Sequence, residues 1–340
     1  MKPLFLGFAG TQLTGEEATF FREVEPAGYI LFRRNVETPD QVKALTASLR
    51  DLSGRDDLPI LIDQEGGRVA RLAPPVWPAF PAGERFAALY ARAPVSAIEA
   101  IRSNALALAI MLAELGITVD CLPVLDVPVP GAHDVIGDRA LGHEPMQVAA
   151  LGAASLEGLA RGGVVGVIKH IPGHGRATAD SHVEMPVVDA SRDALETDLA
   201  PFRKLRDAPM AMTAHVIYTA LDPEHCASLS PSIINDIIRG EIGFDGLLMS
   251  DDLGMHALQG GFGARASGVI EAGCDIALHC SGDMAEMRDI AAAVGEIAPR
   301  ARERLQRAMA MRAAHPDTDF AAAVAHRDAL LAMAGQEGAA

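Results

Sequence analysis

Ionisable side chains gather near the middle of the chain, at the point where a buried strand is expected to end. The run Val164–Ile168 consists of small and β-branched residues, which is typical of a strand buried on both faces, and Lys169 and His170 follow it directly. A polar loop without apolar periodicity then carries Asp180 and His182. A buried strand that opens into a long polar loop is the usual layout of a catalytic end in an α/β protein.

The spacing of Asp180 and His182 indicates acid–base chemistry in this loop. A carboxylate two residues from an imidazole can hold one ring nitrogen, fix the tautomer and raise the proton affinity of the other nitrogen. His174 lies in the same loop, so the sequence leaves open which histidine transfers the proton. We favour His182, because Asp180 is placed to orient it.

Two adjacent carboxylates follow another buried run. Gly246–Ser250 reads as a strand, and Asp251 and Asp252 end it. We expect Asp252 to cap the next segment and Asp251 to point into the same pocket as Lys169 and His182. A carboxylate that faces an acid/base group across a pocket is what retaining glycoside hydrolysis requires, because the carboxylate attacks while its partner protonates the leaving oxygen and then activates water. A neutral imidazole also admits an anionic acceptor, so phosphorolysis remains an alternative to hydrolysis.

Further polar pairs could hold a sugar. Asp63 follows a short apolar run, and Gly66–Gly67 allow a sharp turn before Arg71. A carboxylate and a guanidinium offer an acceptor and a forked donor for hydroxyl or acetamido groups. The alternative is an internal Asp63–Arg71 ion pair that only stabilises the loop, and the same two interpretations apply to Asp138 and Arg139.

The rest of the chain alternates apolar runs with helical patterns, and this alternation occurs eight times. The expected strands are Pro3–Phe8, Tyr29–Phe32, Pro59–Ile62, Ile117–Leu122, Val164–Ile168, Met210–Thr213, Gly246–Ser250 and Asp275–His279. Ionisable residues come just after several of them, and in a (β/α)8 barrel such positions converge on one face. We therefore predict an α/β fold: a single TIM-like (β/α)8 barrel domain over residues 1–340, with a C-terminal helical extension over about 300–333.

Capping signals place the helices between these strands. Thr14 and Glu17 form a capping box, Thr38 and Pro39 begin a helix, and Gly116 ends a long Ala/Leu helix that starts near Val95. We expect Ser191 to cap a helix that runs to about Arg206, and Ser230–Pro231 to begin the next one.

The composition limits the classes of protein that the chain can represent. Apolar residues make up 49% and aromatic residues only 4%, which favours helices packed on parallel strands over a β-sandwich. The net charge of −16 argues against nucleic acid or an anionic membrane as the main partner. Neither a signal peptide nor a membrane-spanning run is apparent, so we expect a cytoplasmic protein. The four cysteines, which we expect to be reduced and buried, show no zinc spacing: Cys121, Cys226, Cys274 and Cys280.

Four motifs occur in the order Asp63-Gln-Glu-Gly-Gly-Arg, Lys169-His170-Ile-Pro-Gly-His-Gly, Asp180-Ser-His182 and Ser250-Asp251-Asp252-Leu. With Tyr29-Ile-Leu-Phe, Pro123-Val-Leu-Asp126 and Gly243-Phe-Asp-Gly246, they resemble glycoside hydrolase family 3 β-N-acetylglucosaminidases of the bacterial cell-wall recycling type. The likeness covers nearly the whole chain. Gly254 departs from it, because serine is common at that position, and the second domain of some members is absent.

This resemblance implies a barrel that removes β-linked N-acetylglucosamine from non-reducing ends, with muropeptides bearing 1,6-anhydro-N-acetylmuramic acid as substrates. By position, Asp251 matches the nucleophile, His182 the histidine acid/base and Asp180 the residue that orients it. The positions that hold the sugar match Asp63, Arg71, Arg139, Lys169 and His170. We expect a monomer that needs neither cofactor nor metal, and a loop around Asp180 that closes over bound sugar.

Two other functions are compatible with a barrel. A metal-dependent hydrolase of the amidohydrolase type would use Lys169, His170, His215 and Asp251 as ligands, but it needs a His-x-His pair where this chain has Phe8-Ala-Gly-Thr. A non-catalytic sugar-binding barrel is expected to have lost Asp251 or the Asp180–His182 pair, and all three residues are present. Trp77 is the only tryptophan, which favours a small pocket for one sugar over a long polysaccharide groove.

Overall fold

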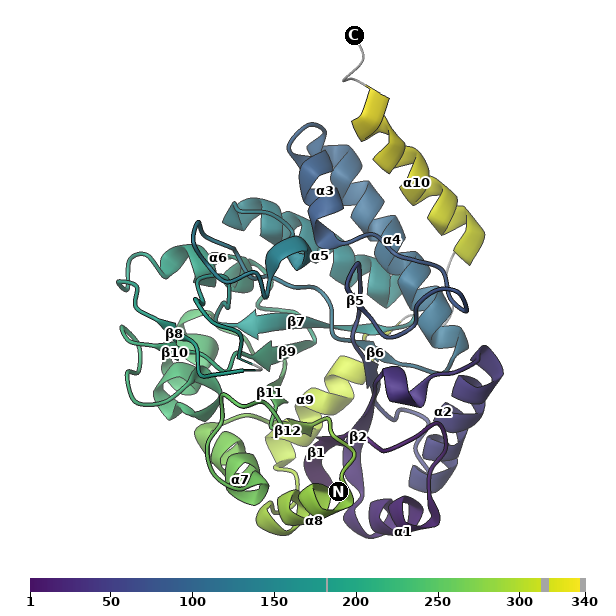
Figure 1. The fold of residues 1–340 in the computed structure, drawn as a ribbon, viewed down its shortest axis with the longest axis vertical. Coiled ribbons are helices and arrows are strands. Elements are labelled where there is room, and N and C mark those ends of the chain that lie inside the picture. Colours follow the sequence, from purple (N-terminus) through teal and green to yellow (C-terminus); the bar gives the residue numbers. More distant parts are fainter. Residues whose placement is uncertain (182, 313–317, 337–340) are drawn as a thin grey trace.

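The computed structural model describes residues 1–181, 183–312 and 318–336. Within them, eight parallel strands close into a barrel in the order β1-β12-β11-β9-β7-β6-β3-β2 (Figure 1). These strands are β1 (Lys2–Leu6), β2 (Pro26–Leu31), β3 (Ile60–Ile62), β6 (Val119–Asp120), β7 (Val165–Ile171), β9 (Met210–Thr213), β11 (Leu247–Asp252) and β12 (Ile276–His279). The predicted (β/α)8 barrel is confirmed, and each expected strand overlaps an observed one.

Alternation along each strand separates two apolar layers. Phe5, Ile30 and Leu61 point into the barrel, whereas their neighbours Leu4 and Tyr29 belong to the layer beneath the helices. Branched, straight-chain and sulfur-containing side chains fill the barrel interior, so it is a packed core and not a channel.

The outer helices are α1 (Gly15–Val24), α2 (Pro39–Ser53), α4 (Pro94–Glu114), α5 (Pro145–Arg161), α6 (Glu196–Lys204), the π-helix η4 (Ile233–Glu241), α7 (Phe262–Ala272) and α8 (Met284–Ala293). The capping box at Thr14 and Glu17 and the cap at Thr38 are present as expected. Gly116 follows α4 with a φ of 76°, a conformation that glycine adopts without strain. The helix α4 is long and apolar enough to cross a membrane, but 72% of its apolar window is buried, as in a core helix.

One sequence prediction about the helices needs correction. Ser191 accepts a hydrogen bond from the Ala194 amide, but α6 begins only at Glu196, so Ser191 caps a turn that precedes the helix. The sequence analysis also missed α8 and the short helix α3 (Gly83–Tyr90). The predicted C-terminal extension is two helices, α9 (Pro299–Met309) and α10 (Phe320–Gln336), which occupy different places.

The helix α9 covers the N-terminal end of the barrel. The Ile297 amide just before it donates to the Met1 carbonyl, at the start of β1. Its apolar side chains, among them Leu305 and Met309, join the interior cluster of strand residues. The helix α10 instead packs along α4 and α3 on the outside of the barrel (Figure 1). The C-terminal ends of the strands are left to form the functional face.

Candidate functional site

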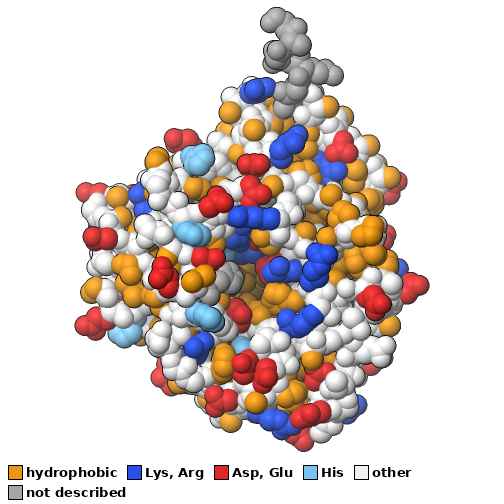
Figure 2. All heavy atoms as spheres, in the orientation of Figure 1, with side chains coloured by type: hydrophobic (Ala, Val, Ile, Leu, Met, Phe, Trp, Pro, Cys, Tyr) orange, Lys and Arg blue, Asp and Glu red, His pale blue; other side chains and the backbone are white. Residues whose placement is uncertain are grey.

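A pocket of about 300 Å³ lies at the C-terminal ends of the barrel strands. Figure 2 shows acidic and basic side chains gathered around a hollow in the middle of this face. The pocket is lined by residues at or just after the C-terminal ends of β2, β3, β7, β9, β11 and β12 and by the loop around Ile136. Its volume is at the small end of ligand pockets, which range over about 300–1,000 Å³. Of the predicted site residues, it brings together Asp63, Arg71, Arg139, Lys169, His170 and Asp251.

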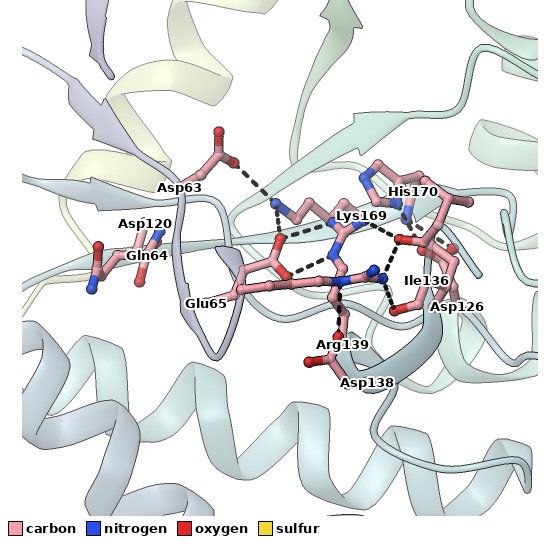
Figure 3. A network of polar contacts seen from close by, with 12 residues as sticks. Asp63, Gln64, Glu65, Asp120, Asp126, Ile136, Asp138, Arg139, Lys169 and His170 are labelled. Atoms are coloured by element: carbon pink, nitrogen blue, oxygen red, sulfur yellow. Dashed lines mark hydrogen bonds and ion pairs between the residues drawn. The ribbon is translucent and has the colours of Figure 1, made fainter. Parts of the chain in front are cut away.

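A network of ion pairs forms one wall of the pocket (Figure 3). Lys169 Nζ lies 3.1 Å from Asp63 Oδ1 and 2.7 Å from Glu65 Oε1. Glu65 also accepts two hydrogen bonds from Arg139, at 2.8 Å each, in a bidentate pair. The side chains of Lys169 and Glu65 are only 2% and 4% exposed. The network therefore holds the two cations at fixed positions beside the cavity, with Lys169 almost entirely shielded from water.

The pKa values in this network reflect a balance between burial and pairing. Burial raises the pKa of Glu65, but the adjacent cations Lys169 and Arg139 lower it by a larger amount. The net result is a pKa of about 2. For Asp63 the same opposition, here with Lys169 and Arg71, leaves the pKa well below its usual range. Burial lowers the pKa of Lys169, but the two carboxylates raise it more, so the ammonium stays charged.

This balance predicts how stability depends on pH. Because the folded-state pKa of Glu65 is depressed from 4.5 to about 2, its contribution is present above pH 4.5 and is lost as the pH falls toward 2. We expect the free energy of unfolding, measured in urea, to decrease by about 3 kcal/mol from this group over that window. The raised pKa of Lys169 acts in the opposite direction and weakens the fold only above its ordinary value of 10.5. In a Glu65→Gln variant the free energy of unfolding should fall less steeply between pH 4.5 and pH 2 than in the wild type. Equal slopes in the two proteins would contradict the assignment of this pH dependence to Glu65.

A third carboxylate, Asp126, anchors the segment that follows β7. Asp126 Oδ2 lies 2.7 Å from His170 Nδ1, and Oδ1 accepts from the amides of His170 and His174. Burial raises the pKa of Asp126, but the two histidines lower it to about 2, so the carboxylate is ionised. The His170 ring is therefore held by its Nδ1 atom, and His170 lines the pocket.

Arg71 extends the cationic wall toward the pocket mouth. Its Nη2 atom lies 3.0 Å from Asp63 Oδ2, and its guanidinium carbon lies 4.9 Å from the centre of the Phe32 ring. The internal Asp63–Arg71 pair considered from the sequence does form, within the pocket lining. The corresponding Asp138–Arg139 pair does not: Asp138 lies 2.8 Å from Arg68 Nε, and Arg139 pairs with Glu65.

Asp251 and Asp252 end β11 at the opposite wall. The Asp252 amide donates to Asp251 Oδ1 at 2.8 Å. Asp252 Oδ1 accepts from the amides of Gly254 and Cys280, at 3.0 Å each, so it caps the following turn as expected and joins β11 to β12. These contacts fix the backbone that presents Asp251 to the cavity.

The loop after β7 reaches the same pocket. Ser181 lines the cavity, and its carbonyl accepts from the Ala257 amide in the loop after β11. His182 lies outside the described residues, and Asp180 is half-buried. His174 is buried at the base of the loop, where burial and the nearby His170 lower its pKa to about 4. His174 is therefore neutral at neutral pH.

The chemistry of the donors does not fit the metal-dependent alternative. The Lys169 ammonium pairs with two carboxylates and stays protonated, so it has no lone pair for a metal. His215 is fully buried, and its two ring nitrogens contact Ser228 Oγ at 2.8 Å and the Asp252 carbonyl at 3.1 Å. Two of the four residues that this alternative needs are thus engaged elsewhere.

Glu65 and Asp126 are the site residues that the sequence analysis did not assign. Both lie in motifs that it singled out, Glu65 two positions after Asp63 and Asp126 at the end of Pro123–Asp126. Alternation along an extended segment places Asp63 and Glu65 on one side, and this was the signal available for Glu65. The role of Asp126 depends on a contact across 44 positions of sequence, which spacing does not reveal.

Comparison with known proteins agrees with this geometry. The family model of the glycosyl hydrolase family 3 N-terminal domain matches residues 7–310. A β-hexosaminidase from Alkalilimnicola ehrlichii is 41% identical over 82% of this chain and 80% of its own length, and one from Bordetella avium is 38% identical over 93% and 90%. The structure of NagZ from Neisseria gonorrhoeae in complex with N-trifluoroacetyl-D-glucosamine has a TM-score of 0.84 and 33% identity, covering 98% of this chain and 97% of that one. The chain therefore belongs to glycosyl hydrolase family 3, and within it to the β-hexosaminidases.

Proposed function

We propose that this β-hexosaminidase is a retaining exo-β-N-acetylglucosaminidase that releases N-acetylglucosamine from GlcNAc-1,6-anhydroMurNAc muropeptides during peptidoglycan recycling. We further propose that residues 1–340 act as one catalytic domain, as a monomer in the cytoplasm. The observation that carries the proposal is the small pocket with Asp251 on one wall and a fixed cationic network on the other. The NagZ complex with a glucosamine derivative supports the choice of sugar.

In this mechanism Asp251 is the nucleophile. Its carboxylate oxygen forms a bond to C1 of the sugar while the bond from C1 to the leaving oxygen breaks, and His182 donates a proton to that oxygen. His182 then removes a proton from water, which attacks C1 and releases the carboxylate. Two inversions at C1 give net retention. Asp180 orients the imidazole, and Asp63, Arg71, Arg139, Lys169 and His170 hold the sugar hydroxyl and acetamido groups.

The direct test is hydrolysis of a chromogenic β-N-acetylglucosaminide, with the corresponding β-glucoside as control. We expect cleavage of the acetamido sugar alone, with the β-anomer of N-acetylglucosamine as the first product seen by NMR. Runs with and without inorganic phosphate separate hydrolysis from phosphorolysis, because phosphorolysis gives a sugar phosphate in place of the free sugar. Cleavage of neither substrate would reject the proposed function, and an α-anomer as first product would reject retention.

Replacement of His182 should affect the two half-reactions differently. A nitrophenolate leaves without protonation, so His182→Ala is expected to form the glycosyl-enzyme readily and hydrolyse it slowly, giving a burst of nitrophenol and a steady rate lower by about 10²–10⁴-fold. His174→Ala is the matched control in the same loop, because the low pKa of His174 leaves it without a proton to donate at neutral pH. Loss of the burst pattern in His182→Ala, or its appearance in His174→Ala, would reverse the assignment.

A further inference from the structure

The segment Phe80–Gly83 packs against the backbone of both parts of the chain that carry the Glu65–Arg139 pair. Glu65 is on β4 (Gln64–Gly66), which turns through Gly66 and Gly67 into β5 (Val69–Ala70). The Gly67 amide donates to the Phe80 carbonyl at 2.9 Å. A Cβ on Gly66 would lie 2.4 Å from the Pro81 carbonyl oxygen, so the turn is pressed directly against this segment.

The other end of the segment contacts the backbone of Arg139. A Cβ on Gly83 would lie 2.4 Å from the Arg139 carbonyl oxygen, a distance that no side chain tolerates. The segment Phe80–Gly83 thus supports the turn that carries Glu65 on one side and the residue that carries the guanidinium on the other. A displacement of this segment would change the separation of the two charged groups.

The C-terminal helix α10 holds the segment in place through the Phe80 ring. The Phe80 ring is 6% exposed, and the guanidinium carbon of Arg327 on α10 lies 5.4 Å from its centre. Phe320, at the start of α10, packs edge-on against the same ring with a centroid distance of 6.4 Å. Arg327 is itself 6% exposed, and its Nη1 atom donates to Asn104 Oδ1 on α4 at 3.1 Å. The hydrogen bond to Asn104 therefore helps to fix the position of the guanidinium over the Phe80 ring.

We propose that Arg327 is a positioning residue for the sugar pocket, acting through Phe80 on the Glu65–Arg139 pair. The inference rests on the proposed function, because it treats this pair as part of the sugar-binding wall. The helix α10 also lies beyond residue 310, where the match to the family model ends. A buried cation over an aromatic face is favourable when both are held away from water, so Arg327 draws Phe80 and the attached backbone toward α10.

The test replaces Arg327 by methionine, which keeps an apolar stem and removes the guanidinium. We expect KM for the chromogenic β-N-acetylglucosaminide to rise about fivefold with kcat within about twofold, because the segment carries neither the proposed nucleophile nor the proposed acid/base. Arg327→Lys, which keeps a cation, should recover part of the change. His326→Ala is the matched control: His326 bonds Ser103 Oγ at 3.0 Å at the same helix interface, whereas the Phe80 ring contacts Phe320 and Arg327.

Hydrogen exchange of the peptide that covers residues 64–70 gives a readout that needs no turnover. The Gly67 amide should exchange faster in Arg327→Met than in the wild type, and at the wild-type rate in His326→Ala. In addition, Phe80→Leu combined with Arg327→Met should raise KM no more than the larger single effect, since both act on one contact.

The outcomes separate the two claims. If the wild type cleaves the substrate but Arg327→Met leaves KM and exchange at residues 64–70 unchanged, the positioning role is wrong. Equal effects in His326→Ala would assign the change to helix docking and would also overturn it. If the wild type cleaves neither sugar, the proposed function fails, and the exchange measurement alone then decides whether Arg327 holds the turn.

Discussion

Replacement of Asp251 by alanine is expected to lower kcat/KM for an N-acetyl-β-glucosaminide by at least about 10⁴-fold. A nucleophile acts as a unit with its acid/base partner, and its removal leaves only binding and the remaining polar groups to promote the reaction. The backbone around Asp251 is held by hydrogen bonds of Asp252 to Gly254 and Cys280, which the substitution does not touch. The fold and the affinity for N-acetylglucosamine should therefore persist.

Two experiments make the Asp251 prediction specific. Azide added to Asp251→Ala should restore turnover of an activated substrate and give an α-glycosyl azide, because azide attacks C1 from the face that the carboxylate occupied. Asp252→Asn is the matched control, since an amide oxygen can still accept from the Gly254 and Cys280 amides, and its activity should stay within about tenfold of wild type. Wild-type turnover by Asp251→Ala would remove Asp251 from the mechanism.

Glu65→Gln is expected to give the largest loss of stability, about 3–5 kcal/mol. The carboxylate pairs with both Lys169 and Arg139, and the substitution leaves two buried cations without their shared counter-charge. Asp63 remains near Lys169, so the protein should still fold. The unpaired cations should also raise KM for the acetamido sugar, by about 10–100-fold, because the wall proposed to hold the sugar loses its fixed geometry.

Urea unfolding of Glu65→Gln measures the stability loss, and Glu16→Gln provides the control. Glu16 pairs with Arg288 at 3.0 Å on the surface, where both side chains are more than half exposed. A solvated pair contributes about 0–1 kcal/mol, so this substitution should barely shift the unfolding midpoint. Similar losses of stability in the two variants would show that Glu65 is not needed to neutralise Lys169 and Arg139 in the folded protein.

The barrel could be predicted because each of its elements has a local signal. The strand residues around Ile60 and Val165 are apolar on both faces, and capping residues such as Thr14 and Thr38 mark helix starts within one turn. Position after a strand then placed Asp63, Lys169 and Asp251 on one face, and these residues do line one pocket. Local sequence signals were therefore sufficient to place those pocket residues whose location depends only on their position along a strand.

The remaining features depend on contacts between distant segments. The choice of Glu65, not Asp138, as the partner of Arg139 follows from how the β4–β5 turn meets the loop after β6, and nothing near Arg139 in the sequence encodes it. The start of α6 was misplaced because Ser191 caps a local turn with the same hydrogen bond that begins a helix. The separation of α9 from α10 depends on which apolar surface each helix covers, and composition alone does not distinguish the two.

The position of α9 has a consequence for the order of events in catalysis. Since this helix covers the N-terminal end of a barrel whose interior is packed with side chains, the described residues close the pocket at its base. Under the proposed function, a glycan enters the pocket by its non-reducing end and each encounter removes a single sugar, because a pocket closed at its base does not let the glycan pass through. In the proposed mechanism the aglycone therefore leaves the pocket before the freed sugar does. The free monosaccharide should thus compete with substrate for the pocket and act as a competitive product inhibitor.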